Sequence, residues 1–345
     1  MGKNILILGY FGDKSNKLNG QTVKTRDLYR LISSKCGNVS YFDTERFQYD
    51  KLSVLELLKK LAKCHTLVYL PAHGNLKYIF PVLFLLSLLF RFKILYFIIG
   101  GWLVEYLSTK PMHRAMLRRI DNIYSETSLM KEKLQQNYKF NNVKIFPNFR
   151  FTNYAPTAHH ASGYLKLVFM ARIDKKKGID TIFELGNYIK TKYTKNQIII
   201  DFYGQINPDD TDFFKQGIER FQFMSYKGAL QPKEIHQTLS QYDALILPTH
   251  YYTEGLPGSV IDAYTAGIPV IVSNWKHAKE FVKDNHCGYI IPFTDNLPEF
   301  KEKIDFLYNN PDALAQMKQN AIKESKKYSP EFAWTIIKDK FNLQQ

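Results

Sequence analysis

The sequence predicts an α/β protein built from two consecutive domains of similar design. Short apolar runs alternate with helical segments, which is the pattern of parallel β-α-β units. The alternation begins near residue 4, is interrupted between residues 148 and 162, and begins again at residue 165. A length of 345 residues suits two domains better than one.

The first run contains four short apolar segments that read as strands. Pro71 and Gly100 end two of them. The expected strands cover residues 4–9, 39–42, 66–70 and 94–99, and the expected helices cover 22–33, 54–63 and 82–90.

The second run repeats the pattern, and Pro330 lies where a last helix would begin. The polar stretch 148–162 reads as the linker. We therefore expect domains at 1–155 and 156–329, followed by a helix at 330–345. The expected strands of this run cover residues 165–170, 198–203, 244–247, 270–272 and 289–291, and the helices cover 179–192, 233–240, 259–266, 298–308 and 311–327.

The cysteine content favours a reducing, cytoplasmic location. Cys36, Cys64 and Cys287 are odd in number and widely spaced, and no C-x-x-C occurs. This spacing argues against a disulfide framework and against a structural zinc site. The N-terminal residues enter a strand pattern directly, so we expect no cleaved signal peptide.

The longest apolar stretch runs from Tyr78 to Phe90 and contains Pro81. It is shorter than the ~20 residues that a membrane span needs. We expect a buried helix here.

The net charge of +15 is concentrated in the first half of the chain. Residues 1–155 hold 24 Lys and Arg against 10 Asp and Glu, a balance of 24 − 10 = +14. The first half is therefore expected to favour an anionic surface, either membrane lipid, nucleic acid or a phosphorylated substrate.

The densest motif is LPTHYYTEGLPGSVIDAYTAGIPVIV, at residues 247–272. Gly255 and Gly258 allow backbone N–H groups to approach a ligand closely. The helix that starts near Ser259 has an N-terminus suited to an anion such as a diphosphate. Because any β-α-β unit has a glycine-containing turn, this turn alone does not decide the function.

A second motif, FMARIDKKKGID, follows the strand at 165–170. Arg172 and Lys177 are two cations beyond the end of a strand, where they can clamp a diphosphate and stabilise its developing charge. The alternative is a solvated basic turn, since Lys175 and Lys176 are adjacent.

Together these motifs resemble the signature of retaining glycosyltransferases of the GT-B fold, in particular family 4 (group 1) of the bacterial polysaccharide-assembly type. That family shows two Glu residues separated by seven positions, followed by small residues and G-x-P-V. Here Glu254 and Asp262 hold the acidic positions, and Gly267, Pro269 and Val270 follow. The resemblance implies two Rossmann-like α/β/α domains facing a cleft, with a C-terminal helix that crosses back to the N-terminal domain.

The resemblance also implies roles for single residues. Glu254 contacts hydroxyls of the donor sugar, Asp262 holds the ribose, and Arg172 and Lys177 clamp the diphosphate without a metal. The donor is bound by Gly255, Leu256, Pro257, Gly258, Ser259, Asp262 and Gly204.

In the first domain, the resemblance places a phosphate and acceptor loop after the first strand, at Asn19, Gly20, Gln21 and Thr22. Family members often carry a site His near the end of the strand at 94–99, where this chain has Gly100, Gly101 and Trp102. His73 is the candidate substitute for this His, and an ordinary surface-loop histidine is the alternative. We expect His73, Gly100, Gly101 and Trp102 on the acceptor side of the site.

Two further features each allow a structural and a functional explanation. Asp209, Asp210 and Asp212 include a D-x-D sequence, which binds metal in another glycosyltransferase fold, but we expect a helix N-cap here. Lys110, Arg114 and Arg118 recur every four residues, and Met112, Met116 and Ile120 can form another face of the same helix. The charge of +14 in the first half favours a basic amphipathic helix that lies on a membrane, and the alternative is a solvated face of an ordinary helix. Lys59 and Lys63 add a similar basic pair, and no nucleic-acid module is recognised.

The function that the resemblance implies is transfer of a sugar from a nucleoside-diphosphate sugar to a hydroxyl of a lipid-linked saccharide, with retention and without a cofactor. Capsule, exopolysaccharide or O-antigen assembly at the inner face of the cytoplasmic membrane fits this reaction and the basic first domain. Three alternatives stay open: a sugar-nucleotide epimerase, a soluble disaccharide synthase and a non-catalytic sugar-nucleotide-binding subunit.

Overall fold

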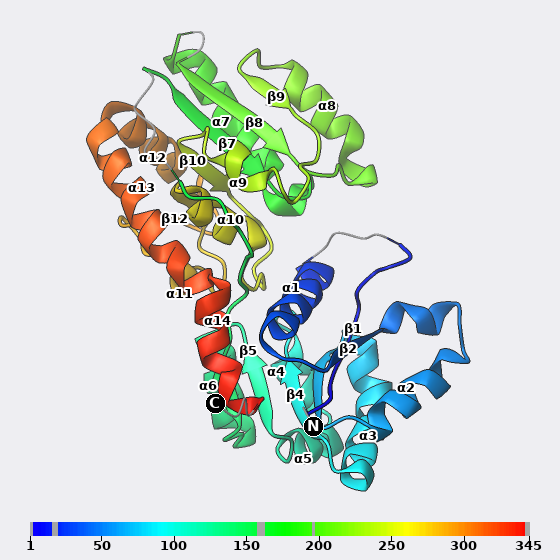
Figure 1. Cartoon of the computed structure of the whole chain (residues 1–345). Coiled ribbons are helices and arrows are strands. Elements are labelled where there is room, and N and C mark those ends of the chain that lie inside the picture. Colours follow the sequence, from blue (N-terminus) through cyan, green and yellow to red (C-terminus); the bar gives the residue numbers. More distant parts are fainter. Residues whose placement is uncertain (1–2, 16–19, 157–162, 195–196, 342–345) are drawn as a thin grey trace. The chain divides into compact units, whose positions relative to one another are not determined.

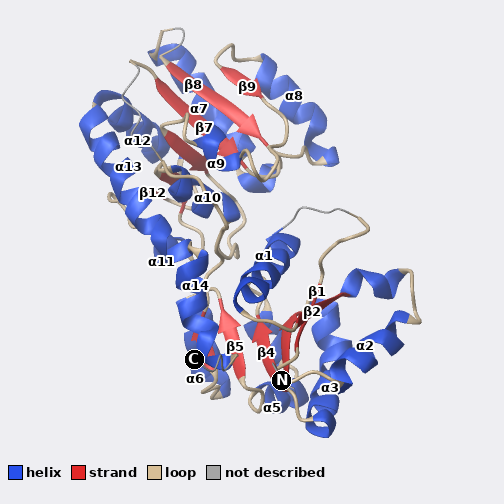
Figure 2. Ribbon diagram, viewed as in Figure 1, coloured by secondary structure: helices blue, strands red, loops and turns tan. Residues whose placement is uncertain are grey.

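The structure is a computed structural model that describes residues 3–15, 20–156, 163–194 and 197–341. The chain forms two compact units (Figure 1). Unit 1 comprises Met1–Phe151 and Ser329–Gln345, and unit 2 comprises Thr152–Tyr328. Each unit is built on a six-stranded sheet (Figure 2).

The sheet of unit 1 has the strand order β2-β1-β3-β4-β5-β6, and all its neighbouring strands are parallel. Its strands are β1 (Ile5–Gly9), β2 (Val39–Asp43), β3 (Thr66–Leu70), β4 (Lys93–Phe97), β5 (Asn122–Ser125) and β6 (Val143–Ile145). Its α-helices are α1 (Gly20–Lys35), α2 (Ser53–Ala62), α3 (His73–Phe90), α4 (Leu103–Ser108), α5 (Pro111–Leu117), α6 (Ser128–Tyr138) and α14 (Pro330–Ile337). The 3-10 segment η1 (Thr44–Gln48) follows β2.

Alternate side chains of these strands fill two separate cores, one on each face of the sheet. In β1, Leu6 and Leu8 belong to the core shared with α2 to α6, whereas Ile5 and Ile7 belong to the core shared with α1 and α14. This alternation follows from the two-residue repeat of a strand. The apolar runs of the sequence therefore mark strands that are buried on both faces.

The last helix completes unit 1, which confirms the predicted return of the chain to the N-terminal domain. The Ser329 hydroxyl caps α14 by accepting a hydrogen bond from the Phe332 N–H at 3.1 Å. Pro330 occupies the first helical turn, as expected for a residue that lacks an N–H. Ala333 and Ile337 then enter the core between α1 and the sheet.

The sheet of unit 2 has the order β12-β11-β10-β7-β8-β9 and is also parallel. Its strands are β7 (Leu165–Met170), β8 (Ile198–Tyr203), β9 (Met224–Tyr226), β10 (Ala244–Leu247), β11 (Val270–Ser273) and β12 (Gly288–Ile291). Its α-helices are α7 (Ile179–Lys192), α8 (Thr211–Glu219), α9 (Ile235–Leu239), α10 (Gly258–Ala266), α11 (Ala278–Phe281), α12 (Leu297–Asn309) and α13 (Pro311–Ser325). The two-domain α/β prediction is confirmed.

The expected basic membrane helix at 110–120 is not what the structure shows. α5 has seven residues, and Met116 and Ile120 are buried in the core rather than presented on a face. The Arg118 guanidinium donates a hydrogen bond to the Tyr138 carbonyl at 2.7 Å. The cations therefore lie on the outer side of a segment whose apolar side chains Met116 and Ile120 pack into the core of unit 1.

The expectation of a buried helix at 78–90 is also wrong for most of its length. Only 22% of α3 is buried, although it is the one helix of the described chain that is long and apolar enough to cross a membrane. Leu85 and Leu89 are 64% and 70% exposed. Packing within unit 1 therefore accounts for only part of the apolar composition of this helix.

Candidate functional site

In unit 2, the chain reverses its direction of sheet growth between β7 and β10. From β7 the strands proceed outward through β8 and β9, and from β10 they proceed the other way through β11 and β12. The carboxyl ends of the two strands on either side of such a reversal bound the common ligand crevice of open α/β sheets. The loops 171–178 and 248–257 follow these two ends, and they carry both sequence motifs.

The loop after β7 is fixed by contacts with both neighbouring loops. The buried Asp210 carboxylate accepts the Lys175 N–H at 3.1 Å. On the other side, the Lys176 carbonyl accepts the Thr249 hydroxyl at 3.1 Å and the His250 N–H at 2.9 Å. These bonds hold the basic turn in one conformation, whereas a freely solvated turn lacks such partners.

Asp210 therefore has a different role from the expected helix cap. It occupies the N-cap position of α8, but its side chain makes no capping hydrogen bond and faces the 171–178 loop instead. Within the described ranges, no group of three or more His, Cys, Asp or Glu side chains is arranged to hold a metal ion.

Lys177 and Glu254, predicted from separate motifs, form an ion pair between the Lys177 ammonium and the Glu254 carboxylate. Their side chains are 23% and 16% exposed, so the pair is partly desolvated but open to a ligand. The Lys177 ammonium also lies 5.8 Å from the centre of the Tyr251 ring. The structure thus brings one cation and one acid together at the β7–β10 reversal.

Arg172 lies just beyond the end of β7, next to Ala171, and its side chain is exposed. It makes no ion pair within the described part of the chain. Its guanidinium therefore remains available to a bound anion, although no contact joins it to the Lys177–Glu254 pair in this state.

The N-terminus of α10 adds a second anion-binding element. Pro257 precedes the helix, and none of the described side chains caps it. Backbone N–H groups at an uncapped helix N-terminus favour negative charge. The Trp275 indole N–H donates to the Gly255 carbonyl at 3.2 Å and so fixes the loop in front of the helix. Leu256 and Pro257 are buried, whereas Gly258 and Ser259 are half-buried at the helix start.

The structure adds His236, a residue that the motifs did not indicate, to the site. Asp262 is only 5% exposed, and its Oδ1 atom lies 3.3 Å from Nε2 of His236 on α9. His236 is separated from Asp262 by 26 positions and belongs to no motif, so only the fold reveals this contact. A carboxylate oriented by a neighbouring imidazole is well placed to accept hydroxyl hydrogen bonds.

Gly204 has a structural reason to be glycine. Its φ is +144°, and a Cβ atom at this position would lie 1.8 Å from the Ala171 carbonyl oxygen. The close approach packs the end of β8 against the end of β7, directly before Arg172. Its predicted part in donor binding remains a prediction.

In unit 1, the sheet reverses between β1 and β3, and the loop after β1 is organised by two buried acids. The Asp43 carboxylate accepts the Phe11 N–H at 3.0 Å and the Asp13 N–H at 2.9 Å. The Glu45 carboxylate accepts the Lys14 N–H at 2.9 Å and the Tyr10 hydroxyl at 3.0 Å. These bonds fix residues 10–14, which belong to the described part of the loop after β1.

The sequence-predicted residues of this loop lie at its far end. Asn19 lies outside the described residues. Gly20 is exposed at the first position of α1, and a Cβ atom there meets no described atom within 4 Å. Gln21 is half-buried and Thr22 is fully buried in the same turn. Since packing does not require glycine at position 20, the residue leaves room for a ligand to approach the helix.

Loop order in unit 1 should weaken in acid through Glu45. Hydrogen bonds from the Ser15 hydroxyl and the Lys14 N–H hold the pKa of Glu45 below its usual value. A lowered folded-state pKa stabilises the fold above the unfolded pKa of about 4.3, and this contribution is lost as pH falls through the folded-state value. We expect thermal unfolding of Glu45→Gln to show a smaller loss of stability between about pH 5 and pH 3 than the native chain. An identical acid dependence of the two proteins would contradict this role.

His73 and Trp102, both predicted on the acceptor side, are brought together. His73 begins α3 just after the end of β3, and its ring centre lies 4.8 Å from that of Trp102 in an edge-on contact. Tyr106 contacts both rings. Gly100, with φ at +76°, and Gly101 form the turn that places Trp102 here. The exposed His73 imidazole therefore packs against Trp102 and Tyr106 near the β1–β3 reversal.

Residues 153–324, nearly all of unit 2, match the family model described as Glycosyl transferases group 1. Over its whole length the chain resembles the crystal structure of Anabaena Alr3699/HepE in complex with UDP, with a TM-score of 0.74 and 15% identity, covering 98% of this chain and 99% of that one. The sucrose-phosphate synthase of Thermosynechococcus elongatus gives a TM-score of 0.70 at 14% identity and 98% coverage of both chains. The fold is therefore GT-B, and the family match supports the class of glycosyltransferase.

Two curated proteins are similar over parts of the chain. A chitobiosyldiphosphodolichol beta-mannosyltransferase of Candida glabrata is 39% identical over 70 residues, which are 20% of this chain and 15% of that protein. An N,N'-diacetylbacillosaminyl-diphospho-undecaprenol alpha-1,3-N-acetylgalactosaminyltransferase of Campylobacter jejuni is 25% identical over 164 residues, which are 47% of this chain and 40% of that protein. The chain thus aligns with less than half of the length of either relative.

Proposed function

We propose that the chain is a retaining glycosyltransferase that moves a sugar from a nucleoside-diphosphate sugar to a hydroxyl of a lipid-linked saccharide. The observation that carries this proposal is the Lys177–Glu254 pair in front of the uncapped N-terminus of α10. The Lys177 ammonium and the first N–H groups of α10 supply positive charge for a diphosphate. The adjacent Glu254 carboxylate can accept hydrogen bonds from hydroxyls of the sugar. The family match of unit 2 and the names of the two curated relatives, which both contain a lipid diphosphate, support the same reading.

In this mechanism, unit 2 holds the donor through its β7–β10 loops and unit 1 holds the acceptor. Arg172, Lys177 and the first N–H groups of α10 stabilise the negative charge that develops on the leaving diphosphate, which is the main catalytic contribution. Two side-chain cations at this position make the reaction independent of a metal or other cofactor. Asp262, oriented by His236, binds the ribose hydroxyls.

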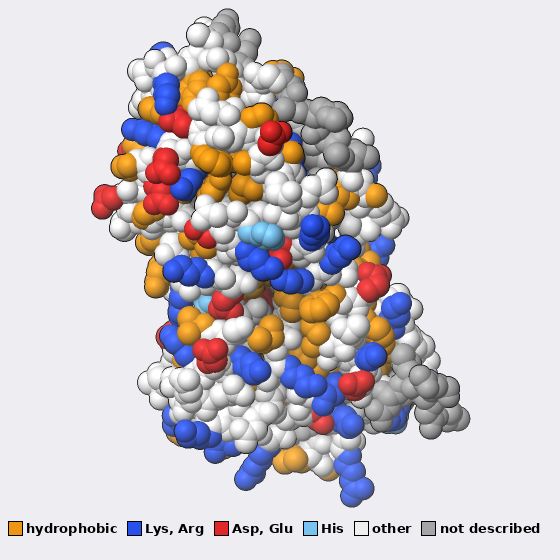
Figure 3. Space-filling model, turned by 90° about the vertical axis from the view of Figure 1, so that its left-hand side faces the viewer, with side chains coloured by type: hydrophobic (Ala, Val, Ile, Leu, Met, Phe, Trp, Pro, Cys, Tyr) orange, Lys and Arg blue, Asp and Glu red, His pale blue; other side chains and the backbone are white. Residues whose placement is uncertain are grey.

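The proposed location is the inner face of the cytoplasmic membrane, in capsule, exopolysaccharide or O-antigen assembly. The charge of the first half supports it, and Lys and Arg side chains outnumber Asp and Glu on the face of unit 1 that Figure 3 shows. Anionic lipid attracts each such cation near its surface.

The test is nucleotide release from a panel of UDP-, GDP- and dTDP-sugars, with and without an extract of lipid-linked acceptors of proven competence. We expect release from one donor that depends on the extract and is lost in Glu254→Ala and Arg172→Ala. Release of nucleotide and free sugar without any acceptor would favour an epimerase instead. Absence of release from every donor would favour a binding subunit.

A further inference from the structure

Unit 1 exposes a set of large apolar side chains on or next to two neighbouring helices, α2 and α3. We call it the α2–α3 face. Its members are each between 37% and 76% exposed, and they are Leu52, Val54, Leu55, Leu58, Tyr78, Val82, Leu85, Leu88 and Leu89.

The face is a regular feature of α3 rather than a frayed end. Tyr78, Val82, Leu85 and Leu89 recur at intervals of four, three and four residues, which places them on one side of a helix. The opposite side of α3 is buried in the core by Leu76, Phe80, Leu83 and Phe84. The helix therefore has two apolar sides, of which unit 1 uses one.

A groove of about 590 Å³ separates the two helices. Its lining is mostly aliphatic, with Leu57, Leu58 and Leu61 from α2 and Ile79, Val82 and Leu86 from α3. Soluble monomers seldom expose an apolar patch of this extent without a partner.

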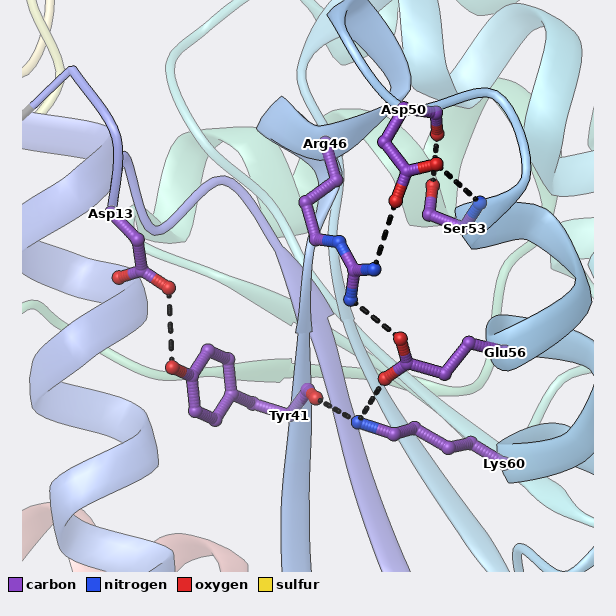
Figure 4. A network of polar contacts seen from close by, with 7 residues as sticks. All are labelled: Asp13, Tyr41, Arg46, Asp50, Ser53, Glu56 and Lys60. Carbon is purple, nitrogen blue, oxygen red and sulfur yellow. Dashed lines mark hydrogen bonds and ion pairs between the residues drawn. The ribbon is translucent and has the colours of Figure 1, made fainter.

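The polar side of α2 takes part in a network of ion pairs and hydrogen bonds within unit 1 (Figure 4). The Arg46 guanidinium joins Asp50 at 3.1 Å and Glu56 at 2.7 Å, and the Lys60 ammonium joins Glu56 at 3.0 Å and the Tyr41 carbonyl at 2.9 Å. Glu56 is the one acidic residue of α2, and α3 has none. The local acids are thus neutralised by cations of unit 1 itself.

Exposed cations flank the apolar side chains. Lys59 on α2 lies four residues after the exposed Leu55, and Lys63, the C-cap of α2, lies four residues after Lys59, so both border the apolar side of the helix. Lys51 precedes α2, Lys77 lies in the second turn of α3, and Arg91 and Lys93 follow its end. An apolar face bordered by cations complements an anionic lipid surface.

The connections of α3 exclude a membrane span in this fold. The helix joins β3 to β4, and these strands pair side by side, with Thr66 opposite Lys93. Crossing a bilayer would separate the two strands and remove four buried side chains from the core. A helix that keeps these contacts can lie only along the membrane surface.

We propose that the α2–α3 face docks unit 1 on an anionic bilayer, with α3 lying in the plane of the interface and Leu85 and Leu89 in the outer acyl region. Lys59 and Lys63 then contact lipid head groups. The inference deepens the proposed function, on which it rests for the lipid-linked nature of the acceptor.

Flotation of the full chain with vesicles tests the docking. We expect binding to vesicles of phosphatidylcholine with 30% phosphatidylglycerol and about tenfold weaker binding to phosphatidylcholine alone. Leu85→Ser/Leu89→Ser should weaken binding to the anionic vesicles about tenfold or more, because apolar burial drives insertion. The matched control is Ile145→Ser/Phe332→Ser, which alters two exposed apolar side chains of unit 1 on β6 and α14.

The electrostatic part has its own pair of variants. Lys59→Glu/Lys63→Glu should lower binding to anionic vesicles about tenfold or more, whereas Lys35→Glu/Lys144→Glu, with the same change in charge on α1 and β6, should have a small effect. Equal loss in both pairs would overturn a defined docking face. A chain that self-associates through Leu85 and Leu89 and ignores vesicles would instead identify a second copy as the occupant.

Depth is measured with Leu89→Cys labelled with an environment-sensitive fluorophore, since Cys36, Cys64 and Cys287 are buried. We expect quenching by lipids labelled near the head group to exceed quenching by lipids labelled at the chain end. The reverse order would overturn interfacial docking in favour of deep insertion.

Vesicle binding and catalysis can be measured separately. Donor turnover by Leu85→Ser/Leu89→Ser on a detergent-solubilised acceptor should equal that of the native chain. Loss of vesicle binding with intact turnover supports docking, whereas retained vesicle binding overturns it and leaves the proposed function in place. Failure of the native chain to turn over any donor would overturn the proposed function alone.

Discussion

Replacement of Lys177 by alanine is expected to lower kcat for sugar transfer by a factor of about 10²–10³, because the lost cation stabilises charge that develops only in the transition state. KM for the donor should change less than kcat. Lys177 is chosen because its ammonium already contacts Glu254 at the β7–β10 reversal. Stopped assays of nucleotide release measure both constants.

Lys176→Ala is the matched control. Its backbone carbonyl holds the turn through Thr249 and His250, while its side chain is exposed, so removal of the side chain should leave kcat within about twofold. Glu254→Gln combined with Lys177→Ala should cost less than the sum of the two single effects, since residues in contact are coupled. Additive losses, or equal losses in Lys176→Ala, would contradict a specific pair.

Gly204→Ala is expected to destabilise unit 2 on the order of 4 kcal/mol, the combined effect of a backbone conformation that favours glycine and of steric overlap. A Cβ atom would lie 1.8 Å from the Ala171 carbonyl oxygen, and φ is +144°. For a unit of this size the loss corresponds to a fall in Tm of roughly 10 °C. Calorimetry of the native and variant chains measures it.

Gly228→Ala separates strain from overlap. Gly228 also has a positive φ, +82°, but a Cβ atom there meets no described atom within 4 Å, so we expect a loss of only about 1–2 kcal/mol. Equal stability losses in the two variants would show that the contact with Ala171 does not matter. A fully stable Gly204→Ala that fails to bind a donor would assign Gly204 to the ligand instead of to the fold.

Most of the fold follows from the sequence because its strands are buried on both faces. Runs such as 66–70 and 244–247 are apolar at every or almost every position and end at Pro71 and Pro248, so pattern and stop agree. The expected strands do not include β9, since its three residues include Ser225 and a half-exposed Tyr226 and since, among the described strands, β8 alone pairs with it. An edge strand carries too little apolar signal to be read from one sequence.

Other features could not be predicted from the sequence, because they depend on which residues contact one another in the folded chain. The apolar composition of 78–90 indicates burial, but composition does not say whether the partner belongs to the same chain. Lys177 and Glu254 could be assigned from motifs, whereas the His236–Asp262 contact and the Asp43 and Glu45 loop contacts could not, because polar residues at strand ends are common. Asp210 is a similar case. An Asp at a helix start is commonly an N-cap, and the sequence does not show that the Asp210 carboxylate accepts the Lys175 N–H instead.

The return of α14 to unit 1 also sets the order in which the chain can mature. Unit 2 is one uninterrupted segment, Thr152–Tyr328, so it can fold as soon as that segment has left the ribosome. Unit 1 cannot finish its core until Ala333, Ile337 and Phe341 are synthesised, although its strands emerge first. During translation of roughly 180 residues, at about 5–20 residues per second, this core of unit 1 therefore lacks the side chains that the C-terminal segment contributes. A chain truncated before residue 330 would lack these side chains permanently, so we expect unit 1 of such a chain to be cleaved by proteases faster than unit 1 of the full chain.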